Sequence, residues 1–182
     1  MIRAMITLSP EKQALMDAFQ QHVDAELRRD LSATLGTMTA DPHLNNIPTA
    51  IGGMGLEGVR QFYSSLILTG TFFPSDTEMV LISRTIDEHQ LVDELIFKFT
   101  HNSEIGWMLP NIAPTGKRVE IPLVVIVGFS HGKLTHEHIY WDQASVLVQV
   151  GLLDERGLPV KGIETAQKME EIRQRCSKAG MV

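Results

Sequence analysis

The chain has 182 residues, of which 43% are hydrophobic, 21% charged and 6% aromatic, as in one ordinary globular domain. The formal net charge of −6 makes it a poor candidate for binding nucleic acid, and its single cysteine, Cys176, excludes an internal disulfide framework and a multi-cysteine zinc site. The longest apolar run, Leu123–Val127, is too short to cross a bilayer, and the first residues have no signal-peptide core. We therefore expect a cytoplasmic protein with no nucleic-acid partner and no membrane partner.

The first 75 residues are predicted to be mostly helical. One helix begins at Ser9–Pro10, since Ser caps helices and Pro suits their first position. Asp30 can cap a second, short helix, which should end at Asp41–Pro42 because the residue before a proline avoids helical geometry. A polar, glycine-rich loop is expected around Gly52–Gly53. A third, amphipathic helix then carries Leu56, Val59, Phe62, Tyr63 and Leu66.

The chain then changes to patterns typical of β-strands. Residues 78–86 and 91–101 flank a polar break and predict a hairpin. Residues 118–129 and 134–141 flank a tight turn and predict a second antiparallel pair.

Two further helices are expected, from Asp142 to Gly151 and over residues 162–178. Helices followed by antiparallel strands indicate an α+β domain.

The segment Thr135–Asp142 holds the densest group of reactive side chains. On a strand, His136, His138, Tyr140 and Asp142 would share one face and Glu137 the other. If the first face is buried, it suits proton transfer near neutral pH, because burial raises the pKa of a carboxyl group and lowers that of an imidazole. The alternative is that this face is simply solvated.

Asp142 and His101 each allow a structural and a functional interpretation. Asp142 stands just before a helix and could be its N-cap, a catalytic carboxylate, or both. His101 ends an apolar strand face formed by Leu95, Phe97 and Phe99, so it is either a structural histidine or a group at the mouth of a pocket.

His136 and His138 also have the spacing of two metal ligands on one strand. A third ligand could come from His101 or Asp142, but nothing in the spacing demands it, so we expect no metal. In the loop after residue 101, Trp107 is a candidate lid over a pocket, and the hydroxyl of Tyr63 is available to one.

Several motifs together resemble a known family. Thr100–Glu104 leads to Pro114–Val119, and Asp142 follows Tyr140–Trp141 before the helical stretch Gln143–Leu153. This pattern resembles the SnoaL-like, polyketide-cyclase-like branch of the nuclear-transport-factor-2-like superfamily, over about residues 10–153.

The resemblance implies a cone-shaped, curved antiparallel sheet wrapped by N-terminal helices, with an apolar pocket at its open end. It implies a domain over residues 1–153 and a helical extension over 154–182 that packs on this domain or on a partner subunit. Members commonly pair through the sheet, so a homodimer is expected.

In the cyclases of this family, a pocket carboxylate removes a proton next to a carbonyl and the enolate closes a ring. The resemblance implies a cofactor-free isomerase, cyclase or lyase for a small apolar carbonyl compound, with Asp142 as base and His138 or His101 as its partner. Glu137 replaces Asp142 if the strand register shifts by one residue. A non-catalytic ligand-binding or interaction module is the alternative. The expected substrate-binding residues are Tyr63, Phe97, Phe99, Trp107 and Tyr140.

Overall fold

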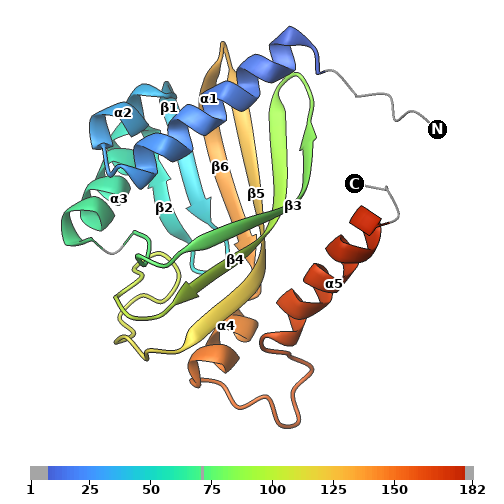
Figure 1. Cartoon of the computed structure of the whole chain (residues 1–182). Coiled ribbons are helices and arrows are strands. Elements are labelled where there is room, and N and C mark those ends of the chain that lie inside the picture. Colours follow the sequence, from blue (N-terminus) through green and yellow to red (C-terminus); the bar gives the residue numbers. More distant parts are fainter. Residues whose placement is uncertain (1–7, 71, 179–182) are drawn as a thin grey trace.

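A curved six-stranded sheet forms the frame of the molecule in the computed structural model, which describes residues 8–70 and 72–178 (Figure 1). The strand order is β2-β1-β6-β5-β4-β3. All neighbouring strands are antiparallel except β1 and β6, which run parallel. In chain order the elements are α1 (Pro10–Leu27), α2 (Leu31–Gly36), β1 (Met38–Asn46), β2 (Ile51–Met54), α3 (Gly55–Thr69), β3 (Glu78–Ile86), β4 (Gln90–Thr100), β5 (Arg118–Ser130), β6 (Lys133–Trp141), α4 (Gln143–Val150) and α5 (Glu164–Lys178).

The α+β class and the helix boundaries follow from local signals that the sequence shows. Ser9 caps α1 by accepting a hydrogen bond from the amide of Lys12, and Asp30 caps α2 through the amide of Ala33. Gly70 and Gly151 end α3 and α4 in the left-handed conformation that glycine adopts without steric cost. These contacts confirm the predicted starts of α1 and α2 and the predicted end of α4, whereas α2 ends at Gly36, before the predicted Asp41–Pro42.

Strands β1 and β2 replace the loop predicted around Gly52–Gly53. The prediction ended the second helix at Asp41–Pro42, because the residue before a proline avoids helical geometry, and placed a polar, glycine-rich loop after it. The structure accommodates Pro42 at an irregularity of β1, where the register against β6 shifts between Met38 and His43. Since β1 pairs with β6, the N-terminal third of the chain supplies part of the sheet.

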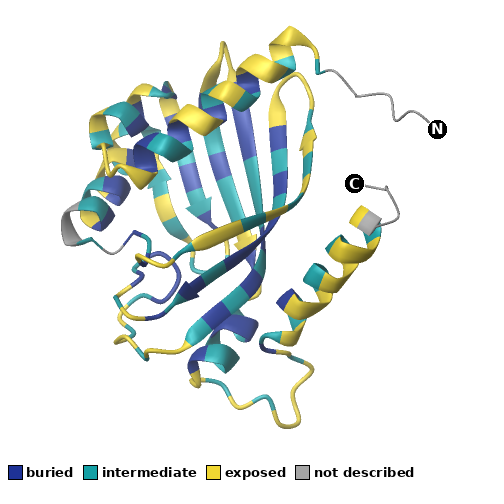
Figure 2. Ribbon diagram, in the orientation of Figure 1, coloured by how far each residue is buried: buried dark blue, intermediate teal, exposed yellow. Residues whose placement is uncertain are grey.

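The sheet has an inner face, covered by the N-terminal helices, and an outer face. Helix α1 crosses the inner face, and α2 and α3 cover its β1–β2 end (Figure 1). The side of α1 turned away from the sheet is exposed, whereas the strands below it are mostly buried or partly buried (Figure 2). Helix α5, from the predicted extension, contacts β3, β4 and β5 on the outer face. Among the described residues, no helix is long and apolar enough to span a membrane.

The loop between β4 and β5 closes one end of the inner face. Its side chains Ile105, Trp107, Met108 and Leu109 are buried, although they lie outside regular structure. The indole Nε1 of Trp107 donates a hydrogen bond to the carbonyl oxygen of Phe72 at 2.7 Å, which fixes the loop against the segment after α3. The loop therefore forms part of the core.

Asp142 is the N-cap of α4, and its substitution should affect stability. Its side chain accepts hydrogen bonds from the amides of Ala144 and Ser145 at 2.9 and 3.2 Å. Asp142→Ala is expected to lower the free energy of unfolding by about 1 kcal/mol, because two helix-terminal amides lose their partner. Asp142→Asn keeps an acceptor and should cost much less. Urea unfolding of both variants checks this, and equal losses would contradict the capping role.

Candidate active site

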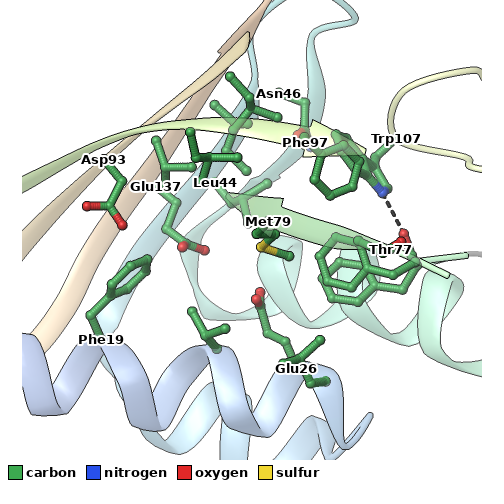
Figure 3. A pocket seen from close by; sticks show the side chains of 18 of the residues that line it. Phe19, Glu26, Leu44, Asn46, Thr77, Met79, Asp93, Phe97, Trp107 and Glu137 are labelled. Atoms are coloured by element: carbon green, nitrogen blue, oxygen red, sulfur yellow. Dashed lines mark hydrogen bonds between the residues drawn. The ribbon is translucent and has the colours of Figure 1, made fainter. Parts of the chain in front are cut away.

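A cavity of about 470 Å³ lies between the inner face of the sheet and α1 (Figure 3). Its wall is mostly aromatic and aliphatic, which suits an apolar ligand. The aromatic lining consists of Phe19, Phe62, Phe72, Phe73, Phe97 and Trp107.

Two carboxylates interrupt this apolar wall. Glu26 reaches the cavity from α1 and Glu137 from β6, so that they lie on opposite elements (Figure 3). The hydroxyl of Tyr63 lies between them, 2.6 Å from Oε1 of Glu26 and 3.1 Å from Oε2 of Glu137. The Nε2 atom of His22 lies 3.3 Å from each of the same two oxygens. These four residues are the buried acid–base cluster.

The protonation of one His22 nitrogen follows from its neighbours. The Thr37 hydroxyl donates its one proton to the carbonyl oxygen of Thr34 at 2.6 Å. Its oxygen therefore accepts from Nδ1 of His22, also at 2.6 Å, so this nitrogen carries a proton. The ring is thus oriented with Nε2 toward the two carboxylates. Thr37 acts as a positioning residue behind the site.

The surroundings push the pKa values of the two carboxyl groups apart. Burial raises the pKa of Glu26, and the attraction of His22 offsets only part of this. Burial also acts to raise the pKa of Glu137, but the imidazolium of His22 and the Tyr63 hydroxyl outweigh it and lower that pKa. These opposite shifts favour a proton on Glu26 and a charge on Glu137, the arrangement that acid–base catalysis uses.

His22 and Tyr63 complete the charge balance of the cluster. Burial disfavours the charged imidazole, but Glu137 and Glu26 together overcome it and raise the pKa of His22 to about 10. Burial and the two carboxylates raise the pKa of Tyr63 well above its ordinary value, so the phenol stays neutral. Cationic His22 is balanced by anionic Glu137, and a proton on Glu26, which its raised pKa favours, leaves the cluster without net charge and so lowers its desolvation cost.

Two further polar features lie on the cavity wall. Arg84 donates two hydrogen bonds of 2.6 Å to the carboxylate of Asp93, which neutralises both side chains. Asn46 donates its amide hydrogen to the carbonyl oxygen of Ile51, while its Oδ1 atom is buried and has no hydrogen-bond partner within the described part of the chain. That oxygen can accept a hydrogen bond from an O–H or N–H group of a ligand.

The cluster also has a composition that metals bind. One ligand atom each from His22, Glu26 and Glu137 lies within 4.8 Å of the others. In the arrangement described here, however, protons already link these atoms, through the Tyr63 hydroxyl and Nε2 of His22. The geometry therefore fits proton transfer without rearrangement.

The predicted aromatic lining is partly in place. Phe97 and Trp107 line the cavity, with ring centroids 5.8 Å apart. Phe99 is fully buried beside Phe97 in the core, outside the cavity wall. Tyr63 is also fully buried, and its hydroxyl lies between the two carboxylates, within hydrogen-bond distance of each.

The residues predicted to be catalytic lie elsewhere. Asp142 is exposed at the start of α4, and His138 and Tyr140 are on the outer face of β6. His101 is fully buried, with its Nδ1 atom 3.1 Å from the Thr115 hydroxyl, and it does not line the cavity. This corrects the face assignment for β6: the alternative register is the one observed, so Glu137 faces the cavity.

The sequence analysis missed His22 and Glu26, although α1 contains a signal for both. Leu15, Phe19, His22 and Glu26 follow the i, i+4, i+7, i+11 spacing of one helix face, and all four are buried. Two ionisable residues in the middle of an apolar helix face require partners. Those partners come from α3 and β6, which helix periodicity alone does not reveal.

Comparison with known proteins finds similar structures but no similar sequences among family models and curated proteins. By sequence, no protein-family model and no curated protein matches the chain. By structure, a candidate SnoaL-like polyketide cyclase from Jannaschia sp. CCS1 has a TM-score of 0.65 at 16% identity, covering 81% of this chain and 99% of that one. An NTF2-like protein of unknown function from Burkholderia pseudomallei K96243 has a TM-score of 0.57 at 14% identity, covering 76% and 98%.

A third similar structure is an enzyme described with a role in the formation of a natural product. SalBIII, an epoxide hydrolase/cyclase-like enzyme with a role in pyran-ring formation in the polyether salinomycin, has a TM-score of 0.51 at 13% identity, covering 71% of this chain and 91% of that one. Identities this low establish the fold alone. The chain therefore has the SnoaL-like form of the nuclear-transport-factor-2-like fold.

Proposed function

We propose that the protein is a cofactor-free acid–base enzyme of the isomerase, cyclase or lyase type that acts on a small apolar carbonyl compound. The observation that carries this proposal is the pair Glu26 and Glu137, two carboxylates with opposite pKa shifts in a mostly apolar cavity. The lowered pKa of Glu137 keeps its carboxylate ionised and able to accept a proton, whereas the raised pKa of Glu26 favours a carboxyl group that can give one.

The two carboxyl groups have complementary roles. Glu137 removes a proton from a carbon next to the substrate carbonyl, and Glu26 delivers its proton to the carbonyl oxygen, so an enol forms without a net change in charge. Glu137 can give its proton to another carbon of the enol while the hydroxyl proton returns to Glu26, which gives isomerisation. Alternatively, the enol carbon attacks a second carbonyl, the enol hydroxyl proton returns to Glu26, and Glu137 gives its proton to the new alkoxide oxygen, which gives cyclisation.

Tyr63 and His22 serve as positioning residues in this proposal. The Tyr63 hydroxyl has one proton and lies within donating distance of both Glu26 and Glu137. When it donates to Glu137, its oxygen is free to accept a proton held by Glu26. This chain of hydrogen bonds can carry a proton from one carboxyl group to the other after turnover. His22 remains cationic and supplies the charge that holds Glu137 ionised.

The cavity wall indicates what kind of substrate fits. Aromatic rings of Phe97 and Trp107 on one side and Phe19 on α1 suit a flat, unsaturated or aromatic framework. The free Oδ1 atom of Asn46 suits a hydroxyl group on that framework. The structures of similar fold include a candidate polyketide cyclase and the epoxide hydrolase/cyclase-like enzyme SalBIII, and this supports the proposed reaction class.

Glu137→Gln is expected to abolish base catalysis. Enolisation can be detected without knowledge of the natural reaction, because an enolised compound exchanges its α-hydrogens for deuterium in D2O. NMR measures this exchange over a panel of cyclic ketones, hydroxylated aromatic ketones and 1,3-diketones. For any compound exchanged by the wild type, Glu137→Gln should lower the rate by about 10²- to 10⁴-fold, the usual contribution of one general base. Glu26→Gln should also lower the exchange rate, since the carbonyl oxygen of the substrate loses its proton donor.

Asp142→Asn separates this mechanism from the one expected from sequence. Asp142 is exposed and outside the cavity, so this variant should exchange hydrogens at the wild-type rate. Loss of exchange in Asp142→Asn, with exchange kept in Glu137→Gln, would overturn the assignment of the base. Binding of panel compounds without exchange would favour the non-catalytic ligand-binding module.

The protonation of His22 provides a test that needs no substrate. Because its pKa is raised from 6.5 to about 10, its ring signals should stay those of an imidazolium through neutral pH and titrate near 10. The stabilising contribution of His22 is then complete below about pH 6.5 and is lost as the pH rises through about 10. NMR titration of the ring and urea unfolding against pH measure both effects. In Glu137→Gln the midpoint should fall, and an unchanged midpoint would contradict the cluster.

A further inference from the structure

Three imidazoles gather on the outer face of the sheet, on the opposite side from the cavity. His136 and His138 project from β6 on the same face because side chains alternate along a strand. His43 of β1 pairs in register with His136 and projects beside them. All three are partly buried, and none belongs to the proposed acid–base machinery.

The ring centroids of the three histidines have the spacing expected around one metal ion, although one nitrogen from each ring does not yet lie within 4.8 Å of the other two. With Zn–N bonds of about 2.0–2.1 Å and tetrahedral angles, three ligand nitrogens lie about 3.3 Å apart and their ring centroids about 5 Å apart. Here Nε2 of His43 is 3.0 Å from Nε2 of His138. The centroids of the three ring pairs are 4.6, 5.0 and 5.1 Å apart.

Two of the three rings already aim at one point. The Nε2 atoms of His43 and His138 face each other, so without a metal they share one proton between them. The ring of His136 is stacked on that of His43, with only 10° between the planes. His136 must therefore rotate about its side-chain bonds to turn a nitrogen to the same point, and its contact with the Thr135 hydroxyl at 3.1 Å is its only hydrogen bond among the described residues.

The sheet leaves room for these rings. Gly128 of β5 lies opposite His136, and a methyl group at this glycine would overlap Cε1 of the His136 ring. The imidazoles are also in the form that metals bind. Burial and the neighbouring histidines lower the pKa of His136 and of His138, which leaves both rings neutral at pH 7.

We propose that His43, His136 and His138 form a binding site for a divalent transition metal, of which Zn²⁺ is the most suitable probe. Imidazole nitrogens are ligands for zinc, copper and nickel, whereas magnesium and calcium prefer oxygen, and this cluster offers imidazoles. Three protein ligands leave one coordination position open to water or to a fourth ligand. This site is independent of the proposed function.

Calorimetric titration of untagged, EDTA-treated full-length protein with Zn²⁺ tests the site. The wild type should bind one Zn²⁺ per chain at the outer face. His43→Gln, His136→Gln and His138→Gln should each weaken this binding by about 10-fold or more, because each removes one ligand. Gly128→Ala should weaken it as well, since it displaces the His136 ring and removes no ligand.

Two matched variants locate the binding. His89→Gln changes an exposed histidine in the β3–β4 hairpin and should leave Zn²⁺ binding unchanged. Glu137→Gln removes a carboxylate from the inner-face group of potential ligands and should likewise leave it unchanged. NMR of the histidine rings in the wild type gives a readout that does not depend on variants, because Zn²⁺ should shift the ring signals of His43, His136 and His138 together.

Three results would overturn the proposal. The first is absence of Zn²⁺ binding to the wild type. The second is binding that persists at full affinity in any one of the three His→Gln variants. The third is binding that Glu137→Gln abolishes, which would place the ion in the cavity. Thermal unfolding of each variant confirms that it remains folded, so that a loss of binding reports on the ligand.

Discussion

The register of β6 between β1 and β5 is the constraint on which both sites depend. Side-chain alternation puts Glu137 on the inner face and its neighbours His136 and His138 on the outer face. A slip by one residue would turn the carboxylate outward and bury two imidazoles against α1. Gly128 opposes such a slip, because it gives the His136 ring space that its neighbours Val127 and Phe129 would not. Strand β6 thus places a carboxylate on one face of the sheet and two imidazoles on the other.

Burial of ionisable groups under α1 requires that they compensate one another. His22 and Glu26 come from α1, Tyr63 from α3 and Glu137 from β6, so the cluster ties three elements together. Removing any one partner leaves a buried charge or hydroxyl without its counterpart, which is costly in a poorly solvated interior. The same interactions that hold α1 on the sheet therefore set the protonation states of the two carboxyl groups.

The sequence predicts most of the fold and little of the site, for physical reasons. Local signals suffice for the helices and for β3 to β6, because caps, glycines and side-chain periodicity act over a few residues. They fail at β1, where Pro42 disguises a strand, and this failure also hid His43 as a neighbour of His136. The titratable face of β6 was identified as a set, but its orientation depends on packing against α1. His22 and Glu26 were missed because their partners are distant in the chain.

The order in which the chain is synthesised has a consequence for the acid–base cluster. His22 and Glu26 emerge early, whereas 74 residues separate Tyr63 from Glu137 on β6. Until β6 is made, β1 also has no parallel neighbour, so neither α1 nor the N-terminal hairpin can reach its final environment. Nascent chains shorter than this strand must keep the buried face of α1 in solvent or against a chaperone. Completion of the sheet and assembly of the site are consequently late, coupled events in folding, as expected for contacts of high sequence separation.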